Sequence, residues 1–397
     1  MKKKVIAIIV AIVLIIPVSR GWYGFLLDYF SDAELVSSTQ LKFEKISDTE
    51  VEVVGYDSYL HGSITIPEKI RIGLYEYKVT RIGSYAFREC SSLTSIKIPD
   101  GVISIGKSAF YGCNSLTSIK IPEGVTSIGD WAFYGCNSLN SIKIPEGVTS
   151  IGESAFVGCS SLNSIKIPEG VTSIGYEAFY GCESLTSIKI PKGVTSIGNW
   201  AFKGCSSLTS INIPESVTGI GGGAFYYCES LTSINIPEGV TNIGASAFYR
   251  CNSLTSINIP ESMTSIGAFA FYRCSSLTSI KIPDGVTSIG YNAFEGCNNL
   301  EPKLLIYDKG TKCYGWIGNK EKCTEVVIPK GVTSIGASAF YRCSSLNSIK
   351  IPESVTSIGE DAFWGCNNLE IVIDNSEKKV KVGWNAFENC KSVKWLK

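Results

Sequence analysis

The sequence predicts a β-rich repeat solenoid, a coil of 23-residue units that share one continuous core. Cysteines recur at nine successive intervals of 23 residues from Cys90 to Cys297, and they resume in the same frame at Cys343 and Cys366. The pair Ala-Phe recurs thirteen times at one position of the repeat, from Ala86-Phe87 to Ala386-Phe387. A fixed period between 20 and 29 residues is typical of solenoids, because one unit cannot bury its own apolar face and needs stacked neighbours.

Each position of the unit has an expected structural role. Residues 116–121 read Leu-Thr-Ser-Ile-Lys-Ile, and this alternation predicts a strand with the isoleucines inward and Ser118 and Lys120 outward. Pro122 lacks an N–H and should end the inter-unit ladder. A second short strand is expected over residues 125–128, and a short helical or 3-10 turn at Ala132-Phe133. Successive units should rise by about 4.8 Å in a right-handed coil.

The repeated pattern L-x-x-I-x-I-P-x-x-V-x-x-I-G-x-x-A-F-x-x-C closely resembles the BspA-type class of bacterial leucine-rich repeats. The match covers about residues 60–390. The resemblance implies an exported surface protein whose solenoid binds other proteins, often as an adhesin, and it brings no catalytic residues. It implies no particular ligand, because binding residues vary between members.

Residues 1–23 predict an export leader. Three lysines at positions 2–4 precede fourteen apolar residues from Val5 to Val18, a run short for a membrane span and typical of a signal peptide. No A-x-A cleavage pattern follows, so an uncleaved signal anchor that extends to Tyr23 is the alternative. In both cases the positive-inside rule places the rest of the chain outside the cytoplasm, with membrane contact only through this segment.

The remaining chain divides into four expected parts. A linker over residues 24–40 precedes an amino-terminal cap over 41–75, the solenoid over 76–373 and a carboxyl-terminal cap over 374–397. The repeat is interrupted between about residues 298 and 325, where residues 307–316 predict a hairpin that projects from the solenoid. Such an insertion either carries a specific contact, as loops on rigid scaffolds often do, or is a spacer.

The composition and the motifs indicate that the protein has no catalytic activity and binds no metal ion or cofactor. Lys plus Arg and Asp plus Glu are 36 each, so the basic excess of a nucleic-acid binder is missing. The single histidine, His61, excludes chemistry that needs two imidazoles in one chain. Gly101–Ser108 fits the phosphate-loop pattern G-x-x-x-x-G-K-[ST], but Val102 and Ile105 occupy core positions of the repeat. We therefore expect a non-enzymatic protein with no nucleotide, metal or other cofactor.

Twelve of the cysteines occupy one core position of the repeat. Their side chains should be parallel and one unit apart, which suits a buried ladder of reduced thiols better than disulfides. Cys313 and Cys323 lie outside this ladder and flank the hairpin, so they either pair as a disulfide or stay apart.

The outward strand positions form the first candidate binding surface. A row of serines runs beside a row of lysines that changes to asparagine from Asn212 to Asn258, and an acidic row lies three residues further on. This side of the sheet is either a solvated, internally neutralised face or a polar concave surface for a protein ligand of a host or cell surface. The predicted contacts are Lys97, Lys120, Lys143, Lys166, Lys189, Ser118, Ser141 and Ser164.

An aromatic row after Ala-Phe forms the second candidate surface. Its rings either cover the edge of the core or bind a partner or glycan. Trp131 and Trp200 lack an evident core role and are predicted to be better exposed anchors. The row consists of Tyr111, Tyr134, Tyr180, Tyr226, Tyr249, Tyr272, Tyr341 and Trp364.

Together these features predict a cell-surface binding scaffold, anchored through its amino terminus or secreted. Protein recognition or adhesion through the solenoid face is the main interpretation, and glycan binding through the aromatic row is the alternative.

Overall fold

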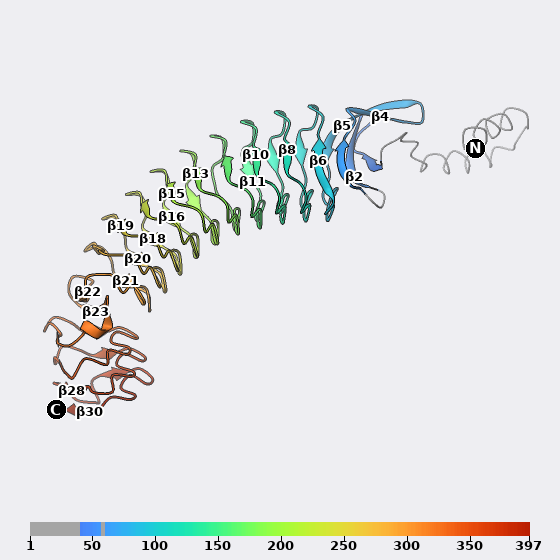
Figure 1. Cartoon of the computed structure of the whole chain (residues 1–397). Helices are drawn as coiled ribbons and strands as arrows, with labels where there is room; N and C mark the ends of the chain where they lie inside the picture. Colours follow the sequence, from blue (N-terminus) through green and yellow to red (C-terminus); the bar gives the residue numbers. More distant parts are fainter. Residues whose placement is uncertain (1–39, 57–59) are drawn as a thin grey trace, which may run out of the picture.

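The computed structural model describes residues 40–56 and 60–397, which coil into a β-solenoid. The predicted leader over 1–23, and the linker up to residue 39, lie outside the described residues. Figure 1 shows the turns succeeding one another along an arc from the amino-terminal strands to the carboxyl terminus. Within the described ranges, no helix combines the length and the apolar character needed to cross a membrane.

The first strands of the units up to residue 258 form a parallel sheet of nine strands. Ser118, Ile119 and Lys120 pair in register with Ser141, Ile142 and Lys143 of the next unit. Because the side-chain period is two, a slip of one residue would expose every isoleucine, and the repeated sequence therefore fixes the register. The strands are β3 (Gly62–Thr65), β6 (Leu93–Lys97), β8 (Ser118–Lys120), β10 (Ser141–Lys143), β12 (Ser164–Lys166), β13 (Ser187–Lys189), β15 (Ser210–Asn212), β17 (Ser233–Asn235) and β19 (Ser256–Asn258).

The second, shorter strand of each unit forms a separate line that is interrupted once within the regular repeats. One sheet ends at β11 and the next begins at β14, with only an isolated bridge from Ile174 to Ile197 between them. The first sheet holds β1 (Leu41–Lys45), β2 (Glu50–Tyr56), β4 (Lys69–Ile72), β5 (Tyr75–Ile82), β7 (Ser104–Ile105), β9 (Ser127–Ile128) and β11 (Ser150–Ile151). The second holds β14 (Ser196–Ile197), β16 (Gly219–Ile220), β18 (Asn242–Ile243), β20 (Ser265–Ile266) and β21 (Ser288–Ile289).

The last third of the described chain continues both lines in two further sheets. One contains β22 (Lys303–Tyr307), β23 (Lys312–Ile317), β25 (Ser334–Ile335), β27 (Ser357–Ile358) and β29 (Lys381–Val382). The other contains β24 (Val326–Val327), β26 (Ser348–Ile351), β28 (Glu370–Ile373) and β30 (Ser392–Trp395).

The predicted hairpin exists, but it does not project from the solenoid. β22 and β23 pair antiparallel, and β23 then pairs parallel with β25 as a rung of the second line. Cys313 and Ile317 are only 1% and 2% exposed. The prediction of a projecting hairpin is wrong because alternate residues of β23 face inward and extend the core.

The two ends of the coil are built differently. At the amino terminus β1 and β2 form an antiparallel hairpin and β2 continues parallel to β5, while β3 already pairs with β6 as a rung. At the carboxyl terminus, residues 374–397 add a further turn through β29 and β30.

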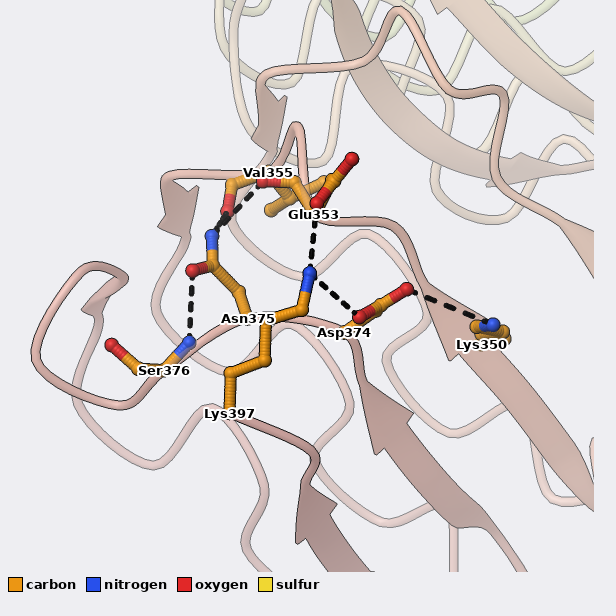
Figure 2. Close-up of polar contacts among 7 residues, drawn as sticks. All are labelled: Lys350, Glu353, Val355, Asp374, Asn375, Ser376 and Lys397. Carbon is orange, nitrogen blue, oxygen red and sulfur yellow. Dashed lines mark hydrogen bonds and ion pairs between the residues drawn. The ribbon is translucent and has the colours of Figure 1, made fainter.

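Polar contacts fasten that last turn to the one before it (Figure 2). Lys397 Nζ lies 2.8 Å from Glu353 Oε2 and 3.2 Å from Asp374 Oδ1. The Asn375 amide donates to the carbonyls of Glu353 at 3.0 Å and Val355 at 3.2 Å. Side chains of the final unit therefore tie it to the preceding turn.

Stacked phenylalanines form the spine of the core. From Phe87 to Phe294, the rings of successive units lie 5.3 to 5.5 Å apart and nearly parallel. The segment at Ala-Phe is a turn, one of the two expected forms, with i→i+3 bonds such as Cys113 N–H to the Phe110 carbonyl, and it is not a regular helix because the Phe110 N–H donates to Ala132 of the next unit. Positive φ angles of 52° at Ser108 and 71° at Gly112 interrupt any helical path there. In the described ranges the one 3-10 helix is η1 (Lys320–Lys322).

The thiol ladder is confirmed, and it is longer than predicted. All fifteen cysteines are free, and all but Cys390 are buried. Cys323 and Cys343 are neighbouring thiols in the same buried cluster, and Cys390 Sγ donates to the Phe363 carbonyl at 3.2 Å. Cys323 therefore belongs to the ladder from which its spacing seemed to exclude it. Of the two alternatives for Cys313 and Cys323, the structure has the second, because both are free thiols without a disulfide.

The glycine after the second strand is required by the close approach of neighbouring turns. A Cβ built on Gly129 would lie 2.6 Å from the Gly106 carbonyl carbon. Gly175 occupies the same position of the repeat and lies at the interruption after β11. A Cβ built on Gly175 would lie 3.8 Å from its nearest neighbour, the Cα of Glu153. The backbones of neighbouring turns therefore approach less closely at Gly175 than at Gly129.

Candidate binding surfaces

The outward side of the nine-stranded sheet, here called the strand face, carries the predicted serine and lysine rows. Ser118, Ser141 and Ser164 are exposed beside Lys120, Lys143 and Lys166. The pairing register places each serine beside serine and each lysine beside lysine. The residues predicted from the sequence as one surface are therefore brought together by the fold.

Three of the five predicted lysines are held in ion pairs. Lys143 Nζ lies 2.7 Å from Glu123 Oε1, and Lys189 Nζ lies 2.7 Å from Glu169 Oε1. Lys166 makes the equivalent pair with Glu146. Each lysine reaches back to the turn of the preceding unit, and its hydrogen bond lowers the pKa of the glutamate, as at Glu123. This part of the strand face is internally neutralised.

Lys97 and Lys120 differ from the other three. Neither makes an ion pair among the residues that the structure describes. Asp100 lies twenty residues before Lys120, at the position where Glu123 lies before Lys143, and the aspartate side chain is one methylene shorter than that of glutamate. The amino-terminal end of the strand face therefore presents two exposed ammonium groups.

The strand face changes its chemistry over β15, β17 and β19. Asn212, Asn235 and Asn258 replace the lysines and, with the serines and isoleucines of the same strands, line a hollow of about 560 Å³. Glu215 and Glu238 on the adjoining turns are exposed, and they have no ion pair within the described ranges. This asparagine segment thus offers uncharged hydrogen-bonding groups bordered by two free carboxylates.

Apart from Tyr180, the rings of the aromatic row stack on neighbouring rings of the row. The rings of Tyr226 and Tyr249 are 4.4 Å apart, and those of Tyr249 and Tyr272 are 4.8 Å apart, at angles of 11° and 12°. Both faces of Tyr249 are therefore covered, and only its edge and hydroxyl face outward. Because a sugar stacks on a free ring face, the interior of the row does not provide such a platform.

The two predicted tryptophan anchors are half-buried rather than fully exposed. Lys107 Nζ lies 4.5 Å from the ring centroid of Trp131, and Lys203 Nζ lies 4.6 Å from that of Trp200. Trp200 also meets Tyr226 edge to face at 5.6 Å. A cation covers one face of each indole, which reduces the area that either can offer to a partner.

A cavity of about 620 Å³ lies beside the aromatic row, between Arg250 and Arg273. Sequence reasoning did not single out these arginines. They could have been noticed in the sequence, because both stand directly before the ladder cysteine, where most other units carry glycine.

Sequence comparison identifies the repeat. A family profile described as a BspA type leucine rich repeat region, in 6 copies, matches residues 80–206, 172–301 and 317–397. The chain belongs to the BspA-type leucine-rich repeat family. Among curated proteins, none matches it significantly.

Several solved structures resemble this BspA-type chain. A leucine-rich repeat protein from Bacteroides ovatus ATCC 8483 is 31% identical, with a TM-score of 0.67 over 92% of this chain and 100% of that one. A leucine rich cell surface protein from Faecalibacterium prausnitzii A2-165 is 29% identical, with a TM-score of 0.49 over 88% and 96%. The pneumococcal vaccine antigen PcpA is 20% identical, with a TM-score of 0.56 over 90% and 96%, and shares the fold.

Motifs that resemble chemical sites are parts of the BspA-type repeat. Val102 and Ile105, within the stretch that fits a phosphate loop, are 0% and 2% exposed and belong to the core. His61 is exposed next to β3. In the described part of the chain, no three His, Cys, Asp or Glu side chains are grouped so that they could hold a metal ion.

Proposed function

We propose that this BspA-type chain is a non-enzymatic scaffold, displayed at the cell surface, that binds a protein partner through the strand face. The observation that carries the proposal is the in-register row of exposed polar side chains across nine adjacent strands. A surface held in place by a continuous core loses little conformational entropy when it binds. Membership of the BspA-type family supports the same assignment.

The asparagine segment is the proposed centre of the contact. A partner that approaches Lys143 or Lys189 must compete with an existing ion pair, whereas Asn235 and Asn258 are free of one. The carboxylates of Glu215 and Glu238 favour basic side chains on the partner. Lys97 and Lys120, with the paired lysines after them, form the flank of the same surface.

Two triple variants test this proposal on the full chain. Changing Asn212, Asn235 and Asn258 to lysine installs the residue that other units already carry, so folding should be retained. Changing Lys120, Lys143 and Lys166 to glutamate reverses the charge of the flank. A partner is first identified by cross-linking to extracellular proteins, and its affinity is then measured by biolayer interferometry.

We expect the asparagine variant to weaken binding at least about tenfold, and the lysine variant to change mainly the association rate. The control is Lys378→Glu with Lys379→Glu, which alters two exposed lysines away from the strand face. Unchanged affinity in both triple variants, with circular dichroism intact, would contradict the proposal.

A further inference from the structure

One position of the repeat carries arginine on two adjacent turns where most units carry glycine. Glycines at this position have φ angles of 70° to 77°, as at Gly135 and Gly296. Arg250 and Arg273 adopt the same left-handed region, with φ angles of 56° and 57°. This conformation is disfavoured for a residue with a Cβ, but it belongs to the repeat, since Glu89 and Tyr227 adopt it at the same position with φ angles of 60°.

The two arginines lie at a cavity of about 620 Å³. Three successive turns add one polar side chain each, from the position that follows the ladder cysteine, namely Asn252, Ser275 and Asn298. The cavity is therefore lined by two guanidinium groups, two amides and a hydroxyl, all contributed at the repeat spacing.

Both guanidinium groups are positioned by rings and carry unpaired charge. The Arg250 guanidinium carbon lies 5.2 Å from the Tyr227 ring centroid, and that of Arg273 lies 5.4 Å from the Tyr272 centroid. Neither has an ion pair within the described ranges, and Arg250 Nε is buried without a hydrogen-bond partner. Two guanidinium charges that line one cavity without a carboxylate partner favour an anionic ligand, which their remaining N–H groups can bind.

The carboxylate already present does not fill this role. Glu295 also lines the cavity, but its Oε2 lies 2.6 Å from Lys320 Nζ on the other side. Its charge is therefore balanced by Lys320 and remains available to accept hydrogen bonds from neutral hydroxyl groups.

We propose that this cavity binds the carboxylate of an acidic sugar, such as a uronic acid unit. The planar fork of arginine matches a carboxylate, and the amides and the hydroxyl match the hydroxyl groups of a sugar ring. Tyr272 ends its ring stack, because the next unit carries Glu295 at that position. The lining has no aliphatic side chain that would anchor an acidic peptide. The site is separate from the strand face and does not depend on the function proposed above.

Glycine substitutions give a test that preserves the fold. The double variant Arg250→Gly with Arg273→Gly restores the residue that most units carry and removes the backbone strain. Arg342→Gly is the matched control, since Arg342 has the same conformation, with φ 57°, over Tyr341 and Trp364 but away from this cavity. Circular dichroism and thermal melting check folding, and calorimetry on the full chain measures binding of trigalacturonate.

The parent chain and Arg342→Gly should bind trigalacturonate, and the double variant should lose at least about tenfold in affinity for each arginine removed. Binding should weaken with added salt and be lost for the methyl-esterified trisaccharide. Equal binding of the ester, or an equal loss in Arg342→Gly, overturns the carboxylate site. Equal binding of triglutamate overturns the assignment to a sugar, and absence of binding by the parent chain overturns the site itself. Strand-face variants should leave this binding unchanged.

Discussion

Cys136 Sγ donates a hydrogen bond to the carbonyl of Phe110, 3.2 Å away on the preceding turn. The same carbonyl accepts the backbone N–H of Cys113 at 3.2 Å. Equivalent thiol contacts recur along the solenoid, from Cys113 with Phe87 to Cys390 with Phe363. Cysteine suits this position because it is small and apolar and still supplies a weak donor.

Replacing one ladder cysteine should therefore destabilise the fold. We expect Cys136→Ala to lower the free energy of unfolding by about 1–2 kcal/mol, because it removes the donor and leaves a small cavity. Guanidinium denaturation gives the global value, and amide hydrogen exchange locates the effect around Phe110. Cys390→Ala, at a half-buried site, is the control and should have the smaller effect. Equal losses at the two sites would contradict this account.

The buried thiols should make the fold sensitive to alkaline pH. Burial raises the pKa of the Cys159 thiol from its ordinary 9.0 to about 12, and it raises the pKa values of Cys205 and Cys251 as well. Below pH 9 the thiols are protonated in both states, so their full contribution is present. As the pH rises from 9 towards 12 the unfolded state loses protons first, and stability falls.

Denaturation midpoints at pH 7, 9 and 10.5 measure this effect. The variant Cys205→Ala with Cys251→Ala should show a shallower decline over the same interval, because two of the shifted groups are gone. A slope identical to that of the parent chain would mean that other groups cause the alkaline loss.

Two glycines of the same motif should respond differently to alanine. Gly129→Ala places a Cβ 2.6 Å from the Gly106 carbonyl carbon and should cost about 1–3 kcal/mol through backbone displacement. Gly175→Ala meets nothing nearer than 3.8 Å, so its stability should be unchanged or slightly higher. Thermal melting compares the two directly. Similar melting temperatures would show that the spacing between turns is not what selects glycine.

The buried hydrophobic side chains form two clusters, one from Leu41 to Ile317 and one from Cys313 to Ala386. Lys320 should couple these two clusters. Its Nζ lies 2.6 Å from Glu295 Oε2 and 2.7 Å from the Tyr341 carbonyl, so it bridges turns on both sides of the inserted hairpin. Lys320→Met leaves both acceptors unpaired, and we expect a loss of about 1–2 kcal/mol. Hydrogen exchange should rise in residues 326–397 before it rises in residues 80–250. Lys309→Met, at an exposed lysine of the same hairpin, serves as the control.

The regular part of the fold can be predicted from the sequence, because every unit repeats the same pattern of apolar, polar and glycine positions. The inward positions of Ile119 and Phe133 and the thiol ladder are repeated so often that one local interpretation fits all. The insertion over residues 298–325 does not follow the repeated pattern, so its structure could not be predicted in the same way. Cys323 is 26 residues after Cys297 and 20 before Cys343, so its ladder position is hidden by the different length of chain that the hairpin uses.

The candidate surfaces were predicted less completely. The sequence indicates that an acidic row compensates the lysines, but the pairing of Lys143 with Glu123, twenty residues earlier, requires the geometry of the turn. The substitution of glycine by Arg250 and Arg273 is readable in the sequence. The consequence of this substitution cannot be predicted from the sequence, because the left-handed backbone and the shared cavity are visible only in the structure.

The gap in the second strand line between β11 and Ile174 has a mechanical consequence. A solenoid under tension along its axis carries load through both strand lines and the core. At this junction one of the two lines lacks its ladder, so the load passes to β12 and β13 and to the turns. Within the regular repeats up to β21, elastic extension should therefore concentrate at this joint when the coil is pulled from its ends.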